Sequence, residues 1–386
     1  MPVLEDVLGR IALAQSRRPH LFIAIAVAFT ILTAFGLPNI YLEGDINKQM
    51  PKDLPAMELQ EKVNNRFGGS DTIFIAIQLD KDINAESPIT DIRDPRVLRY
   101  VLELDQSFSE ETVIGEVVSP ALVFKVTGVP DTLDQVKAIM DASPQAGRFF
   151  SDDKTLTLMF LSADIGSNPE RIRSVTNKLQ DILDKASEPA GVKTSITGSP
   201  QIIVTLVRLL ESDAATTLIS AIAVVFVILV LLARAQGVLI VIPLVLGVIW
   251  MFGSLGWLNI PLSFATAGVG AVIVGLGVEY GVFYIKRFYE GIEEGMDAEA
   301  AVQNAVPKVG SAMIGSSATT ILGFLALTLA STPMLQNLGF TLALGIFYSL
   351  VAALIINPPI GLCVEKTCFV KLRKLLPGRK DDSGTG

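Results

Sequence analysis

Six long runs of apolar residues dominate the hydropathy pattern of this chain. Each run has about the 20 residues that a helix needs to cross the hydrocarbon core of a bilayer. Half of all residues are hydrophobic and 18% are charged, which does not fit a soluble globular protein with runs of this length. We therefore expect a polytopic α-helical membrane protein with six transmembrane helices, at residues 19–37, 214–233, 237–258, 262–285, 309–330 and 338–363.

The long polar region between the first and second runs follows a different pattern. Its short segments alternate apolar and polar residues, as strands do, and two longer segments carry apolar residues at helical spacing. A short helix at 132–140 is read as an insertion, and the remaining elements form a β-α-β-β-α-β unit. The expected strands are 71–79, 112–119, 154–163 and 192–198, and the expected helices are 94–108 and 168–186. Residues 38–213 are thus predicted to form an α+β domain of ferredoxin-like type.

The distribution of Lys and Arg predicts the orientation of the chain. Basic residues precede the first run, flank the connections after the second and fourth, and follow the sixth, whereas the connections 259–261 and 331–337 have none. By the positive-inside rule, both termini are cytoplasmic and residues 38–213 are extracytoplasmic, in a cell (plasma or inner) membrane. The cytoplasmic parts are then an amphipathic lead-in at 1–18, a polar helical loop at 286–308 and a tail at 364–386.

Charge and composition exclude several classes of function. The expected outer domain has 18 basic and 28 acidic residues, a balance that argues against nucleic acid as a partner. Both cysteines, Cys363 and Cys368, lie at the end of the last run, so no disulfide crosslinks the outer domain. The single histidine, His20, begins the first run. We find no nucleophile–base pair, phosphate loop or metal cluster, and expect neither an enzyme nor a bound cofactor or metal.

One acidic residue, Glu279, lies inside the fourth apolar run, next to Tyr280. An ionisable group in a spanning helix costs roughly 2.5–3.5 kcal/mol, so it marks a functional site by default. Hydrocarbon favours the neutral form of a carboxyl that has no cationic neighbour, and no Lys or Arg lies in any of the runs. Glu279 is therefore a candidate for a proton-carrying acid. The alternative is a protonated structural glutamate bonded to a neighbouring helix.

Small and hydroxyl-bearing residues accompany this acid. Gly268 and Gly275 share its helical face, where a neighbouring helix or water has room to approach, and Gly277 and Gly281 line another face. The fifth run supplies candidate partners for the carboxyl: Ser316, Ser317, Thr319 and Thr320. Each of these hydroxyls has an alternative, which is to bond back to its own helix. Tyr284 and Tyr289 are interpreted as aromatic residues at the membrane interface.

The run GLGVEYGVFYIKRFYEG resembles the fourth-span signature of the resistance–nodulation–division (RND) superfamily, in its hydrophobe/amphiphile-exporter, MMPL-like branch. GSSATTILGFLAL followed by LGFTLALGIFYSL is similar to the next two spans of that superfamily. QMPKDLPAMELQEKVNNRFGGSD and TGSP resemble the entry to and exit from its outer domain. The chain departs in having Glu where Asp is usual, and one copy of a repeat that typical members carry twice.

The resemblance implies a proton-driven exporter whose porter domain passes hydrophobic or amphiphilic molecules or lipids, in contact with membrane lipid. It implies that Glu279 and Tyr280 form the proton relay with the hydroxyls at 316–320. Two identical chains can supply parallel repeats as well as one duplicated chain can, so we expect a homodimer with each Glu279 facing the second copy. Candidates for the substrate path, each with a core position as its alternative, are Phe67, Phe74, Leu122, Phe124 and Phe160.

Two rival functions remain open from the sequence. The first is a protein-export accessory of the related translocation branch, although the fourth-span motif of that branch differs from GLGVEYG. The second is a lipid- or sterol-sensing membrane receptor that transports nothing. Proton-coupled flux separates a transporter from a receptor, and the sequence does not decide between H⁺ and Na⁺ as the coupling ion.

Overall fold

The computed structural model describes residues 2–44, 49–51, 71–80, 89–163, 169–233 and 235–365, together with positions 55, 59, 62 and 165. The chain divides into two compact units. One consists of Met1–Met50 and Leu210–Gly386, and the other is Pro51–Leu209. Of the candidates for the substrate path, Phe67 lies outside the described residues.

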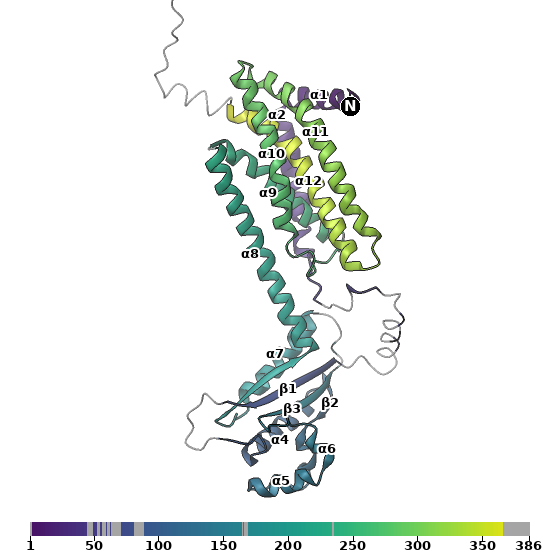
Figure 1. The fold of residues 1–386 in the computed structure, drawn as a ribbon, viewed down its shortest axis with the longest axis vertical. Coiled ribbons are helices and arrows are strands. Elements are labelled where there is room, and N and C mark those ends of the chain that lie inside the picture. Colours follow the sequence, from purple (N-terminus) through teal and green to yellow (C-terminus); the bar gives the residue numbers. More distant parts are fainter. Residues whose placement is uncertain are drawn as a thin grey trace, which may run out of the picture. The chain divides into compact units, whose positions relative to one another are not determined.

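The first unit is a helical bundle (Figure 1). Among the described residues, six helical segments are long and apolar enough to cross a membrane, which confirms the expected number of spans. Its described helices are α1 (Pro2–Arg17), α2 (Pro19–Ala34), α9 (Ala235–Trp257), α10 (Val269–Glu293), α11 (Ala298–Leu325) and α12 (Pro333–Val364), with short 3₁₀ turns η1 (Leu37–Asn39) and η4 (Ala326–Leu329). Helix α8 (Ser199–Ala233) begins in the second unit and continues into the first.

The second unit is built on a four-stranded antiparallel sheet with the order β2-β3-β1-β4. This is the order of the ferredoxin-like unit, so the predicted α+β fold is confirmed. Its elements are β1 (Asp71–Leu79), α4 (Pro95–Ser109), β2 (Ile114–Val118), η3 (Pro120–Val123), α5 (Leu133–Asp141), α6 (Pro144–Gly147), β3 (Leu156–Ala163), α7 (Pro169–Lys185) and β4 (Val192–Gly198).

The core of this unit lies between one face of the sheet and the helices α4 and α7. Ile73, Ile75 and Ile77 of β1 are fully buried with Val101 of α4 and Leu179 of α7. The alternation of β1 produces this face, because successive side chains of a strand point to opposite sides.

Helix α4 begins where the sequence predicts, at a capped proline. The Asp94 carboxylate accepts a hydrogen bond of 2.9 Å from the backbone N–H of Arg96, and Pro95 occupies the first turn. The Arg96 guanidinium also bonds this carboxylate and holds the pKa of Asp94 below its usual range.

A buried carboxylate on α4 holds η3, the 3₁₀ turn that follows β2. Asp105 of α4 is 1% exposed, accepts a 2.5 Å hydrogen bond from the Ser119 hydroxyl and pairs with Lys125 Nζ at 2.6 Å. Ser119 and Lys125 flank η3, so this network attaches η3 to α4.

Helices α2 and α9 approach each other at glycines. A methyl group added at Gly253 would overlap the carbonyl of Thr33, and one added at Gly256 would overlap the carbonyl of Gly36. Small residues permit this close approach of helices in a membrane. Two side chains of α9 bond across the contact: Trp250 Nε1 donates to Thr30 Oγ1 at 2.8 Å, and Trp257 Nε1 donates to the carbonyl of Leu32 at 3.1 Å.

The fourth span begins later than the hydropathy pattern suggests. Residues 259–268 are not helical, and Leu262 forms a parallel bridge with Leu42, in which its N–H donates to the carbonyl of Tyr41 at 2.9 Å. Pro261 explains the extended start, because a proline disfavours helix at the residue before it. Gly268 is consequently the N-cap of α10 and not a residue inside the helix.

Two helices meet within the segment 286–308 that the sequence predicts to be a polar helical loop. Helix α10 continues to Glu293, and α11 begins at Ala298 and runs through Pro307. The start of α11 packs on α1, where Leu8 and Ala12 are buried with Val302 and Val306 (Figure 1).

Candidate functional site

Helix α10 is packed on one side against α9, α11 and α12. On that side a methyl group at Gly277 would lie 2.9 Å from Leu244 Cδ1, and one at Gly281 would lie 2.5 Å from Ile240 Cγ2. Tyr280 is buried on the same side, at 2% exposure. Gly277 and Gly281 therefore allow close helix packing.

The opposite side of α10 is open. Gly268, Val272, Gly275, Glu279 and Phe283 are all exposed, and their spacing of three or four residues places them on one stripe. A methyl group at Gly268 or Gly275 would meet no atom within 4 Å. We call these five residues the α10 stripe. The stripe presents a carboxyl between small and apolar residues on an uncovered face of a spanning helix.

Glu279 makes no hydrogen bond and no ion pair within the part of the chain that the structure describes. Its neighbour Tyr280 lies on a different face of α10, because adjacent residues of a helix are about 100° apart around its axis. The Tyr280 hydroxyl interacts with that of Ser317, which is 1% exposed on α11. The structure therefore separates the predicted relay residues into an exposed acid and a buried tyrosine–serine pair.

Three of the four candidate hydroxyls of α11 bond back to their own helix. Thr319 Oγ1 and Thr320 Oγ1 donate to the carbonyl of Ser316, at 2.7 and 3.2 Å, and Ser317 Oγ donates to the carbonyl of Ile314 at 3.2 Å. Ser316 and Thr319 are exposed and Thr320 is partly exposed. Thr319 and Thr320 thus make the bond of the alternative interpretation, Ser317 makes it in addition to its contact with Tyr280, and the role of the four hydroxyls in a relay remains a prediction.

The sequence analysis misassigned one buried polar side chain, Tyr284, and did not identify another, Asn357. Tyr284 is 1% exposed and stacks on Phe288 at 6.1 Å, so its interpretation as an interfacial aromatic is wrong. Asn357 of α12 is also 1% exposed, and neither it nor the Tyr284 hydroxyl has a hydrogen-bond partner among the described residues. An amide inside a long apolar run, directly before Pro358, was the signal that could have identified Asn357.

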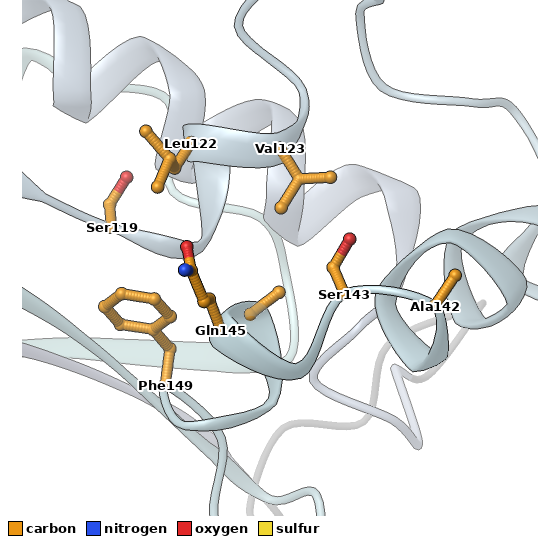
Figure 2. A pocket seen from close by; sticks show the side chains of 8 residues that line it. Ser119, Leu122, Val123, Ala142, Ser143, Gln145 and Phe149 are labelled. Atoms are coloured by element: carbon orange, nitrogen blue, oxygen red, sulfur yellow. The ribbon is translucent and has the colours of Figure 1, made fainter.

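The second unit contains a cavity of about 490 Å³, next to the η3 and α6 turns. Figure 2 shows Leu122 and Val123 on one side of the cavity and Ser143, Gln145 and Phe149 on the other. The Ser143 hydroxyl and the Gln145 amide form no hydrogen bond within the described residues, whereas Ser119 is bonded to Asp105. The cavity thus combines apolar walls with free polar groups, within the usual size range of ligand sites.

The described aromatic candidates for the substrate path, Phe74, Phe124 and Phe160, do not line this cavity. Phe124 is fully buried in the core. Phe74 and Phe160 pack against each other, with ring centroids 5.2 Å apart, on the sheet face opposite the helices. Leu122 is the one described candidate among the cavity residues, and it is 53% exposed.

Comparison with known proteins decides the family. A model of the MMPL family matches residues 96–368. The chain belongs to the MMPL family. The predicted resemblance is therefore confirmed, and this chain is a member of a family of membrane transport proteins rather than of enzymes. No group of three metal-binding side chains occurs in the described regions.

Relatives of this MMPL protein differ in length. A membrane protein of Methanocaldococcus jannaschii is 32% identical over 383 residues, which are 97% of this chain and 98% of that protein. The apo-petrobactin exporter of Bacillus anthracis is 23% identical over 381 residues, which are 94% of this chain and 48% of the exporter. The chain thus spans about half the length of this exporter.

A solved structure shares the fold. The hedgehog release protein Disp from the water bear Hypsibius dujardini superposes with a TM-score of 0.66 at 15% sequence identity. The match covers 93% of this MMPL protein and 49% of Disp. This chain therefore has the fold of about half of Disp.

Proposed function

We propose that two copies of this MMPL protein form an exporter of hydrophobic or amphiphilic molecules, driven by protons that Glu279 carries. The observation that carries this proposal is the position of Glu279: a carboxyl on the open α10 stripe, in a spanning helix, with no hydrogen bond or ion pair to any described residue of its own chain. A charged group facing acyl chains costs about 2.5–3.5 kcal/mol, so this face favours a covering protein surface or water.

A second copy of the chain suits this face. The chain covers about half of an exporter relative and about half of Disp, so a dimer would supply the missing repeat. In a twofold arrangement the same stripe of both copies meets itself. Gly268 and Gly275 would let the two α10 helices approach, with both carboxyls between them.

The hydroxyls of α11 give the carboxyl its proton path in this proposal. Ser316 and Thr319 are on the exposed surface of α11, and Tyr280 with Ser317 lies behind Glu279 inside the bundle. Each hydroxyl both donates and accepts a hydrogen bond, as proton transfer requires. In this proposal the second unit lies outside the cytoplasm, as the positive-inside rule predicts, and protons enter from that side.

Cysteine crosslinking tests the dimer. Gly275→Cys in a background with both native cysteines replaced by Ser should form a disulfide-linked dimer in native membranes, because position 275 lies on the proposed twofold contact. The matched control is Ile31→Cys, at an equally accessible position on α2 that is 55% exposed. Crosslinking at Ile31 but not at Gly275 would contradict this arrangement.

The cavity in the second unit is the proposed place where substrate is held. Its apolar wall of Leu122, Val123 and Phe149 suits an acyl or aromatic portion, and Ser143 and Gln145 suit a polar head. A molecule that has both parts is an amphiphile, the substrate class that the sequence resemblance implies.

Filling the cavity should slow transport. Leu122→Trp adds an indole to the cavity wall and is expected to reduce the export of rhodamine 6G, an amphiphilic probe, about tenfold in proteoliposomes. Val126→Trp is the control, since Val126 is 95% exposed near the same turn and does not line the cavity. Equal rates for the two variants would remove the cavity from the substrate path.

Flux in proteoliposomes tests the function as a whole. The purified chain should move rhodamine 6G when a pH gradient is imposed, and should stop when an ionophore collapses that gradient. A Na⁺ gradient in place of the pH gradient identifies the coupling ion. Binding of the probe without gradient-driven flux would instead indicate a sensing receptor.

A further inference from the structure

The corner between α1 and α2 contains a second cavity, of about 430 Å³. Its geometry follows from the sequence Arg17-Arg18-Pro19, because Pro19 disfavours helix at Arg18. Arg18 accordingly has φ −136° and ψ 60°, and the chain turns there from α1 into the first span. The turn brings together three basic and four apolar residues: Arg10, Leu13, Ala14, Arg17, Arg18, Leu21 and Phe22.

The three arginines of this corner have no anionic partner among the residues that the structure describes. Arg10, Arg17 and Arg18 are exposed, and none of their side chains makes an ion pair or a hydrogen bond within the described residues. The acidic residues of the same helix, Glu5 and Asp6, make no ion pair there either. Three guanidinium groups around one cavity form a concentrated positive site, and their planar donor forks match the geometry of phosphate oxygens.

The apolar residues of the corner point to a lipid as the source of the anion. Leu13 is 38% exposed and Leu21 is 49% exposed, and Leu21 lies in the first turns of a membrane-spanning helix. The cavity therefore combines cationic and apolar walls at the end of a span, where headgroups meet acyl chains. A free phosphate ion would use the arginines and leave the leucines exposed to water.

Helix α1 is held firmly on its other side. The Gln15 side chain is fully buried and its Nε2 donates to the carbonyl of Leu354 at 2.9 Å. Pro358 has no N–H, so this carbonyl lacks the donor that an uninterrupted α12 would supply. Gln303 Nε2 also donates to Ser16 Oγ at 3.1 Å. The arginines are therefore presented by a docked helix and not by a free amphipathic tail.

We propose that the α1–α2 corner is a binding site for one phospholipid with a net negative headgroup, whose phosphate is held by Arg10, Arg17 and Arg18 and whose acyl chain lies along Leu13 and Leu21. The site is on a different part of the bundle from the α10 stripe, and it is independent of proton coupling. A lipid bound at this corner would link α1 to the surrounding membrane. Helix α1 is itself hydrogen-bonded to α11 and α12.

Native mass spectrometry of the full chain in detergent tests this site. Titration with phosphatidylglycerol should show one saturable lipid per chain. The triple variant Arg10→Gln, Arg17→Gln, Arg18→Gln should bind at least tenfold more weakly, and the corresponding triple Lys variant should weaken binding severalfold, because Lys keeps the charge and loses the fork. A control variant, Lys178→Gln with Lys185→Gln and Lys193→Gln, removes three exposed charges from the second unit and should bind as the unmodified chain does.

Two further titrations decide the chemistry. Phosphatidylcholine, whose headgroup has no net charge, should bind at least tenfold more weakly than phosphatidylglycerol, and 10 mM inorganic phosphate should not displace the lipid. Equal affinity of the Gln variant, equal affinity for the two lipids, non-saturable binding or displacement by phosphate would each overturn the proposal. An unchanged melting temperature of the Gln variant establishes that weaker binding is not a loss of fold.

Discussion

Glu279→Gln is expected to abolish proton-coupled transport while leaving the protein folded. Gln has nearly the same size and shape as Glu but does not titrate, so the variant loses the one acid inside the described spans that faces the open stripe. Removing a group that transfers a proton typically costs a factor of about 10²–10⁴ in rate. We expect gradient-driven flux of rhodamine 6G in proteoliposomes to fall at least ~100-fold.

The fold should tolerate this change because Glu279 makes no hydrogen bond or ion pair in the described part of its own chain. Substitutions at such positions usually change stability by less than ~0.5 kcal/mol. The matched control is Glu293→Gln, which removes an exposed carboxylate from the end of the same helix and should leave flux unchanged. Glu279→Asp should retain part of the activity, since the shorter acid still titrates. Full gradient-driven flux in Glu279→Gln would end the proposal that this acid carries the proton.

Gly256→Ala should lower the free energy of unfolding of the bundle, and by much more than Gly315→Ala. The added methyl would overlap the backbone carbonyl of Gly36, and backbone atoms cannot rotate away as a flexible side chain can. Helix α2 would have to move off α9, which would stretch the hydrogen bonds of Trp250 and Trp257 to α2. Overpacking costs about 1–3 kcal/mol, and each lost hydrogen bond costs about 1 kcal/mol.

A melting curve of the detergent-solubilised chain measures this effect. We expect Gly256→Ala to lower the melting temperature by several degrees and to reduce the amount of folded protein in the membrane. Gly315→Ala is the control, because a methyl group at Gly315 meets no atom within 4 Å. Alanine has the higher helix propensity, so this control should be neutral or slightly stabilising. Equal melting temperatures for the two variants would show that α2 and α9 are not in close contact.

Hydropathy predicted the helical spans because a bilayer imposes a length and a composition on any segment that crosses it. Alternation predicted the sheet for a similar reason: β3 has its buried residues at every second position, from Thr157 to Ala163. These patterns arise from the backbone period and from the solvent on each side of an element. They are therefore readable from the chain alone.

Which face of a spanning helix is covered is much harder to read. Lipid tails are as apolar as leucine, so an apolar residue is equally suited to face lipid or another helix. For this reason the sequence paired Glu279 with Tyr280, whereas in the structure one is exposed and the other is 2% exposed. The buried position of Tyr284 was missed for the same reason.

The sequence by itself determined the number of spans, the ferredoxin-like domain between the first two, and the single acid in the fourth. Each rests on a local property: hydropathy over a bilayer thickness, a strand or helix period, or a charge where charge is costly. Only the tertiary structure decided which residues share a surface. In the structure Glu279 lies on an uncovered stripe, and three arginines lie together at the α1–α2 corner. Which residues share a surface depends on how separate helices pack, and the period of a single helix does not determine it.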